Sequence, residues 1–192
     1  NDGADAFIWA SLRGRIDIVR LLLARGAEIN SQRSDGSTAL ICASQNGHSD
    51  VMKLLLENGA EMDQNRNDGM NSLIIAAQNG FTDAVKFLLD KGVDPDLREK
   101  SYQTTALMQA SLNGHPETVR LLLERGADPA IQNKAGATAL LLATQKGYQE
   151  IAGLLLEKEK NHDLTDSEGN TPLMMASQSG NIQIVRQLLV RG

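Results

Sequence analysis

Residue types that support catalysis or metal binding are few and widely separated in this chain of 192 residues, which has three histidines and one cysteine. A zinc site needs three or four such ligands close together. His48 and His115 stand two repeated units apart in the sequence. If neighbouring units pack roughly 10 Å apart, these histidines are about 20 Å apart, too far to share a metal ion. Cys42 has no basic neighbour in the sequence, so we expect a small buried or half-buried thiol and not an activated nucleophile.

The other combinations fit known chemistry no better. His162 lies near Asp163 and Asp166, but this spacing matches no recognised zinc motif. Asp166 and Glu168 do not follow the alternation of a calcium loop, and no glycine-rich phosphate loop occurs. No Ser/His/Asp or Cys/His set can be assembled. We therefore expect no catalytic residues, no metal site and no cofactor.

Composition narrows the choice of partners and compartment. The net charge is −5 and both signs are scattered along the chain, whereas a nucleic-acid binder needs a basic stripe. Because no apolar run reaches about 18 residues, we expect no direct membrane insertion. One cysteine allows no internal disulfide, and the N-terminal residues lack a signal-peptide layout. These features favour an intracellular protein, cytoplasmic or nuclear.

The whole chain repeats itself with a period of about 33 residues, which is typical of stacked supersecondary units and not of one globular core. One glycine column holds Gly14, Gly47, Gly80, Gly114, Gly147 and Gly180. No linker interrupts the period, so the sequence predicts a single domain over residues 1–192. Its units are 1–34, 35–67, 68–101, 102–134, 135–167 and 168–192.

The second unit shows the expected local structure. Thr38 is a plausible N-cap for a short helix over residues 39–44. Gly47 suits the left-handed geometry that ends such a helix. A second helix is predicted to begin at residues 49–50 and to close at Gly59. Each unit is therefore expected to be a helical hairpin followed by a connecting loop.

Some positions depart from the pattern. The fourth unit follows one extra residue and has Gln103 in place of the turn glycine, and Glu159 replaces the closing glycine of the fifth unit. In the last unit Gln187 suggests a polar terminal repeat, because the equivalent residues of the other units are apolar. Val190 argues against a polar terminal repeat, because the equivalent residues elsewhere are Ala, Glu or Asp. Phe7 begins an apolar stretch like that of an internal unit. We expect a segment of a longer array.

The repeated motifs resemble the ankyrin-repeat family. They are Thr38-Ala39-Leu40, Thr105-Ala106-Leu107, Thr138-Ala139-Leu140, Thr171-Pro172-Leu173, Gly47-His48 and Gly114-His115. The resemblance implies an all-α solenoid of helix-turn-helix repeats with short projecting β-hairpin loops and a concave groove lined by loops and first helices. The histidine of the family signature is absent. Its column is apolar instead, so we expect contact between adjacent first helices from Ile8, Ile41, Ile74, Met108, Leu141 and Met174.

In each first helix the three positions i, i+3 and i+4 lie on one face. Each position, followed through the six repeats, forms a column of equivalent residues. The column that starts at Trp9 is largely apolar and is expected to pack between units. The other two columns resemble the family's concave face, and their amides offer donors and acceptors to a protein or peptide. Leu112 and Tyr102 are candidate anchors. The predicted binding residues are Leu12, Arg13, Gln45, Asn46, Gln78, Asn79, Tyr102, Leu112, Asn113, Gln145, Lys146 and Gln178.

We therefore predict a monomeric, non-enzymatic module for protein–protein recognition. A solvated polar face with no ligand would give the same pattern. Two further alternatives are a regulatory array attached to a catalytic or membrane domain outside residues 1–192, and a spacer. The resemblance also implies that Asn30 is a possible asparagine-hydroxylation acceptor, although the same column elsewhere holds Asp63, Asp96, Ala130 and Asp163.

Overall fold

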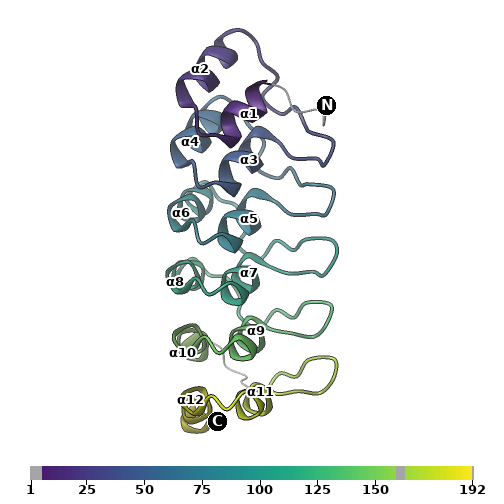
Figure 1. The fold of residues 1–192 in the computed structure, drawn as a ribbon, viewed down its shortest axis with the longest axis vertical. Helices are drawn as coiled ribbons and strands as arrows, with labels where there is room; N and C mark the ends of the chain where they lie inside the picture. Colours follow the sequence, from purple (N-terminus) through teal and green to yellow (C-terminus); the bar gives the residue numbers. More distant parts are fainter. Residues whose placement is uncertain (1–5, 159–162, 192) are drawn as a thin grey trace. The chain divides into compact units, whose positions relative to one another are not determined.

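The computed structural model describes residues 6–158 and 163–191, which form twelve helices in six antiparallel pairs (Figure 1). The chain divides into two compact units: a first unit of residues 1–94 with 99–101, and a second unit of residues 95–98 with 102–192. The first unit holds α1 (Ala6–Leu12), α2 (Ile16–Ala24), α3 (Ala39–Gln45), α4 (Ser49–Glu57), α5 (Ser72–Gln78) and α6 (Thr82–Asp90). The second unit holds α7 (Ala106–Leu112), α8 (Pro116–Glu124), α9 (Ala139–Lys146), α10 (Gln149–Lys158), α11 (Pro172–Gln178) and α12 (Ile182–Arg191).

The first helix of a pair begins where a side chain caps it. Thr38 Oγ1 accepts a hydrogen bond from the Ile41 N–H at 3.3 Å, which confirms the predicted N-cap. Threonine does the same before α7, α9 and α11. Before α5 the cap is Asn71, whose Oδ1 accepts from the Ile74 N–H at 2.9 Å. A short polar side chain at this position therefore fixes where each of these helices starts.

The second helix of a pair is amphipathic. In α4, which begins at Ser49 as predicted, Val51, Met52 and Leu55 are fully buried. Lys53 and Glu57 lie on the exposed face one turn apart, with a 3.9 Å ion pair between them. An exposed pair of this kind contributes little stability, so the buried face holds α4 in place.

The first helices α3, α5, α7 and α9 are buried on most sides, and they form much of the core. The residues Ala39 to Ser44 of α3 are all buried, and α3 contacts both α1 and α5. In the second unit α9 contacts both α7 and α11. Ile41 and Ile74 are 0% exposed and Leu141 is 1% exposed. Apolar contact between adjacent first helices thus replaces the signature histidine, as expected.

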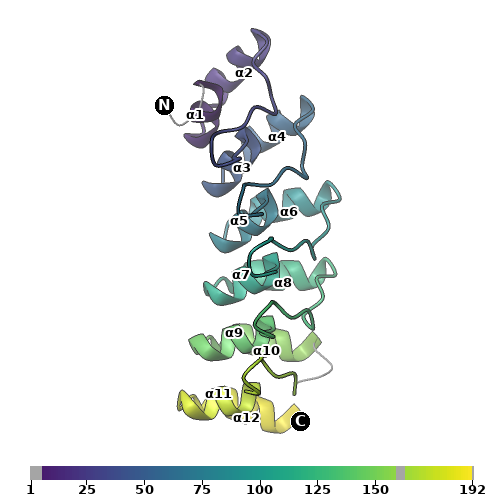
Figure 2. The same ribbon diagram turned by 90° about the vertical axis from the view of Figure 1, so that its right-hand side faces the viewer.

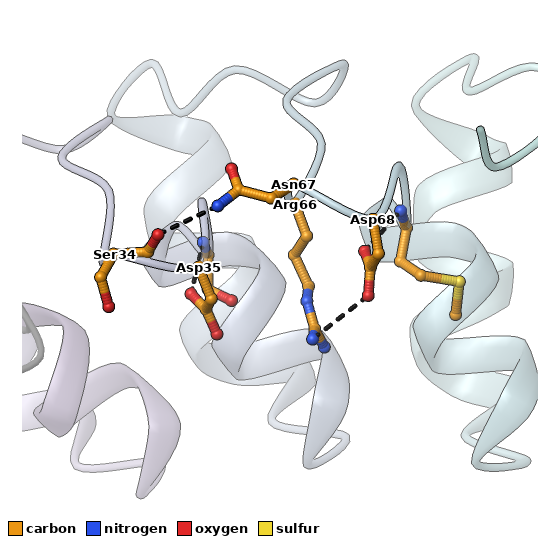
Figure 3. Close-up of polar contacts among 7 residues, drawn as sticks. Ser34, Asp35, Arg66, Asn67 and Asp68 are labelled. Carbon is orange, nitrogen blue, oxygen red and sulfur yellow. Dashed lines mark hydrogen bonds and ion pairs between the residues drawn. The ribbon is translucent and has the colours of Figure 1, made fainter. Parts of the chain in front are cut away.

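Side-chain and backbone hydrogen bonds tie each loop to the preceding one within a unit. Figure 3 shows the contact in the first unit, where Asn67 Nδ2 donates to the Ser34 carbonyl at 3.0 Å. The Asn67 N–H also donates to the Asp35 carbonyl at 2.9 Å. In the second unit the Ser167 N–H bonds the Ala135 carbonyl at 2.8 Å. These bonds hold successive loops in register.

The projecting hairpins are turns with almost no strand. Asp35 Oδ1 accepts from the Ser37 N–H at 2.9 Å, which closes the turn through a side chain. Within residues 6–158 and 163–191 the one isolated β-bridge joins Asn65 and Asn71. Gln103 adopts a φ of +59° and so keeps the left-handed turn that glycine makes elsewhere. Glu159 lies outside the described residues.

The last helix pair exposes apolar side chains. Met174 is 58% exposed, whereas its equivalent Leu141 is 1% exposed beneath α11. Leu189 is 63% exposed and Val190 is 83% exposed, while Gln187 is partly buried. Leu189 corresponds to Leu123 and Leu156, which are buried, whereas Val190 corresponds to Glu124 and Glu157, which are exposed as Val190 is.

Glycine at the inter-helix turn allows a left-handed backbone and also leaves room for a side chain of the next repeat. Gly47 has a φ of +69°, and a Cβ there would lie 2.6 Å from the ring of Phe81 in the next repeat. Gly14 likewise faces the ring of His48 at 2.6 Å. Gly59, by contrast, has a φ of +93°, but a Cβ there would meet no other atom within 4 Å. The column that contains Gly14 and Gly47 therefore allows close packing of the following repeat.

We expect Gly47→Ala to destabilise the protein more than Gly59→Ala. Both changes strain a left-handed backbone, at a cost of roughly 1–2 kcal/mol. Only alanine at position 47 also collides with the Phe81 ring. Urea unfolding followed by circular dichroism would measure both variants. Equal losses would show that the Gly47–Phe81 contact adapts without cost.

Candidate interaction surface

The structure places the predicted binding residues on the last turns of the first helices, apart from Tyr102. In the first unit Arg13, Gln45, Asn46, Gln78 and Asn79 are exposed and Leu12 is half-buried. In the second unit Asn113, Gln145, Lys146 and Gln178 are exposed and Leu112 is half-buried. Tyr102, in the loop before α7, is 72% exposed. Within each unit the first helices, whose ends carry these residues apart from Tyr102, lie side by side in one layer (Figure 2).

The asparagines of this surface cap their own helices. Asn46, Asn79 and Asn113 are the C-cap residues of α3, α5 and α7. Their Nδ2 groups donate to carbonyls four residues back, at 3.2 Å for Asn46, 2.8 Å for Asn79 and 2.8 Å for Asn113. The backbone N–H groups of Asn79 and Asn113 donate to the same carbonyls, at 3.2 and 3.1 Å, so these side chains reinforce the ends of α5 and α7. The asparagine column therefore has a structural role that the sequence prediction did not include.

We expect Asn46→Ala to destabilise the protein by about 0.5–1.5 kcal/mol, because the Cys42 carbonyl loses its side-chain donor. Gln45→Ala is the matched control, since Gln45 is the exposed neighbour on the same helix, and it should change stability by less than about 0.5 kcal/mol. Chemical denaturation of the two variants measures the difference. A loss for Gln45→Ala as large as that for Asn46→Ala would contradict the capping role.

His48 has a structural position. Its Nε2 lies 3.2 Å from the Leu12 carbonyl, at the end of α1, and its ring packs against Gly14. His162 lies outside the described residues. Among the residues that the structure describes, no three His, Cys, Asp or Glu side chains come together as a metal-binding group.

The first-helix column that starts at Trp9 is only partly buried, which corrects one expectation. Cys42 and Ile75 are 1% and 2% exposed, but Trp9 is 41% exposed and is covered by the Arg33 guanidinium, 5.6 Å from its ring centroid. Burial raises the pKa of the Cys42 thiol to about 11. Cys42 is thus a neutral buried thiol, as predicted, while Trp9 faces the surface.

A cleft of about 430 Å³ opens in the second unit. Its lining comes from the ends of α9 and α11 and from the loop before α11. We call it the acidic cleft, defined by Gln145, Asp166, Glu168, Asn170, Met175, Gln178 and Ser179. Two of these residues, Gln145 and Gln178, belong to the predicted binding set. The cleft therefore joins the first-helix surface to a loop.

Hydrogen bonds fix the position and charge of Asp166 in this cleft. Its Oδ2 accepts from Asn170 Nδ2 at 2.9 Å, and its Oδ1 accepts from the Glu168 and Asn170 N–H groups, each at 2.9 Å. The Asn170 side chain and backbone lower the pKa of Asp166. Glu168 is exposed, and its Oε2 accepts a long hydrogen bond of 3.5 Å from Asn170 Nδ2. The cleft thus holds one firmly bonded and one more loosely held carboxylate.

The sequence did not assign Asp166, Glu168, Asn170, Met175 or Ser179 to the binding surface. The signal was present as two carboxylates just before the Thr171 cap. That pair does not fit a calcium loop, and its closeness to Gln145 in the preceding repeat depends on how the repeats stack. Linear spacing alone does not reveal this closeness.

The comparisons with known proteins identify the family. The model for ankyrin repeats (3 copies) matches residues 1–68, 59–133 and 107–192. The chain therefore belongs to the ankyrin-repeat family. A solved ankyrin repeat domain from Acinetobacter baumannii AYE is similar to it, with 32% sequence identity, 97% of each chain covered and a TM-score of 0.88. A search of the curated proteins found no match.

The family and the fold agree with an all-α repeat solenoid. Ankyrin repeats generally serve as protein–protein interaction modules, and the fold is typically non-catalytic. In the part of the chain that the structure describes, no helix is long and apolar enough to cross a membrane.

Proposed function

We propose that this chain is a non-enzymatic module that binds a protein or peptide partner through the exposed face of its first helices and the adjoining loops. The acidic cleft is the observation that supports this most directly. There a loop and the ends of two first helices enclose about 430 Å³, and two predicted glutamines line the space.

The mechanism is complementarity to a preformed surface. Gln145 and Gln178 are exposed, and each amide offers both a donor and an acceptor. Asparagines that are bonded to their own helices hold the neighbouring positions, for example Asn113 on the Gln109 carbonyl. Because little of the surface has to become ordered, little conformational entropy opposes binding.

The proposal extends to how the chain works as a whole. We infer that the six repeats over residues 1–192 act as one domain and as a monomer. An intracellular location suits Cys42, which is a buried free thiol and the only cysteine of the sequence. Half-buried Leu112 and exposed Tyr102 are the apolar anchors of this surface.

Affinity capture from cell extract, with partners identified by mass spectrometry, tests the function. We expect the double variant Tyr102→Ala/Leu112→Ala to bind the purified partner at least about tenfold more weakly, because central apolar anchors dominate interface energetics. The matched control is Ile18→Ala/Leu21→Ala, which truncates two exposed apolar residues of α2. All three proteins must first show the same helical circular dichroism signal.

A partner that tolerates Tyr102→Ala/Leu112→Ala as well as the control would place binding elsewhere and contradict the proposed face. If no partner is captured by any version of the protein, a spacer role is favoured instead.

We also propose Asn30 as an asparagine-hydroxylation acceptor. Asn30 Nδ2 donates to Glu61 Oε1 at 3.2 Å, and Asn30 Oδ1 accepts from the Glu61 N–H at 3.0 Å. The side chain is thus held against the next repeat, so modification requires this loop contact to open. Glu61→Ala removes the side-chain half of the contact.

Intact-mass spectrometry of protein from cells should show a species heavier by one oxygen atom. We expect this species to disappear in Asn30→Gln and to increase in Glu61→Ala. Its absence from the unaltered protein, or its persistence in Asn30→Gln, would exclude Asn30 as the acceptor.

A further inference from the structure

We propose that the acidic cleft takes the side chain of an arginine from the bound protein or peptide. This inference rests on the proposed function and specifies the chemistry of the partner at one place. It depends on the cleft's volume, its two carboxylates and the amide and thioether groups that share its wall.

The carboxylates supply the charge. Asp166 is held by three hydrogen bonds, and a carboxylate offers about four acceptor positions, so Oδ2 keeps room for a further donor. Glu168 is exposed on the same loop, so its carboxylate can turn toward a cation. Charge-assisted hydrogen bonds to carboxylates are stronger than neutral ones.

The helix ends add to this preference. Gln145 lies in the last turn of α9, Gln178 is the last residue of α11, and Ser179 is its C-cap. Carbonyl groups at a helix C-terminus carry partial negative charge and favour a cation. Lys146 follows Gln145 but does not line the cleft. The carboxylates of the loop and the carbonyl groups of the helix ends therefore both favour a positively charged ligand.

The polar and apolar groups favour arginine over lysine. A planar guanidinium presents several N–H donors in a fixed fork, which suits a wall of carboxylate and amide oxygens better than a compact ammonium does. Met175 provides an apolar wall against which the aliphatic stem of the side chain can lie. The cleft volume is within the range of about 300–1,000 Å³ found for sites of small ligands.

The loops of the other repeats with a turn glycine do not repeat this arrangement. The equivalents of Asp166 and Glu168 in the preceding repeat are the uncharged residues Asn133 and Ala135. In the first unit Arg33 and Arg66 stand three residues before the turn glycine, where Asp166 stands here, and Arg66 pairs with Asp68 at 3.3 Å (Figure 3). We therefore expect one arginine site at the acidic cleft and none at the loop of Asn133.

Titration of the full ¹⁵N-labelled chain with N-acetyl-arginine methylamide, followed by NMR, tests this inference. We expect saturable shifts at the side-chain amides of Gln145, Asn170 and Gln178, weaker at higher salt. N-acetyl-citrulline methylamide, which is neutral and has nearly the same shape, should give no saturable shifts. N-acetyl-lysine methylamide should bind about threefold or more weakly than the arginine probe.

Glu168→Gln should weaken arginine binding by about three- to tenfold. Its matched control is Glu124→Gln on α8, an exposed glutamate outside the cleft whose change alters the net charge equally. Gln178→Ala should also weaken binding while leaving the circular dichroism spectrum unchanged.

Shifts absent from the cleft, equal binding of the citrulline probe, or equal losses in Glu168→Gln and Glu124→Gln would each overturn the inference. Equal binding of lysine would overturn the guanidinium preference.

These outcomes are separable from the proposed function. A captured partner that needs Tyr102 and Leu112 but is unaffected by Glu168→Gln would leave the interaction face in place and refute the arginine site. Conversely, a cleft that binds the arginine probe, in a protein whose partner ignores Tyr102 and Leu112, would support the arginine site and refute the wider face.

Discussion

The fold depends on first helices that are too apolar to be covered by their own hairpin. In α3 the six residues from Ala39 to Ser44 are all buried. Its antiparallel partner α4 covers one side, and α1 and α5 cover the others. A repeat of this kind is stable only when stacked. This explains how a chain with 3% aromatic residues forms a core, since each interface needs only a thin row of Ile, Leu and Ala.

Stacking would allow neighbouring repeats to slip unless something set their spacing. Two contacts do this within each unit. Backbone bonds join successive loops, as between Asn67 and Asp35, and rings of the following repeat pack on turn glycines, as Phe81 does on Gly47. In the second unit the corresponding ring is that of Tyr148 on Gly114. Because the contacts recur, equivalent side chains fall into rows, and a row is what a binding surface on such a fold requires.

The sequence predicted most of the fold because its signals are local. Thr38 marks a helix start, Gly47 marks a helix end, and the 33-residue period sets the order of the pairs. Helical spacing put Gln45 and Gln178 on one face of the first helices, and both side chains are exposed in the structure. It did not reveal that Asn46 bonds its own helix, because a polar residue in an exposed row looks the same whether it caps or binds.

Two other features, the exposure of Trp9 and the closeness of Glu168 to Gln145, depend on how the repeats pack in space. The column that starts at Trp9 was expected to pack between units because it is largely apolar, yet Trp9 is 41% exposed and Arg33 lies over its ring. The approach of Glu168 to Gln145 joins residues from two repeats across a loop. Helical periodicity describes one helix at a time, so it gives no distance between a loop and the end of a neighbouring helix.

The alternation of asparagine and glutamine at the helix ends has an evolutionary consequence. In α3, α5 and α7 the asparagine closes its helix, and in α3 the adjacent glutamine is exposed. Mutations at the glutamine positions can therefore accumulate without eroding the structure that presents them. Related arrays can thus change their binding surface through substitutions at the glutamine positions, while selection for stability keeps the asparagines. Adjacent residues in the same turn would then evolve at different rates.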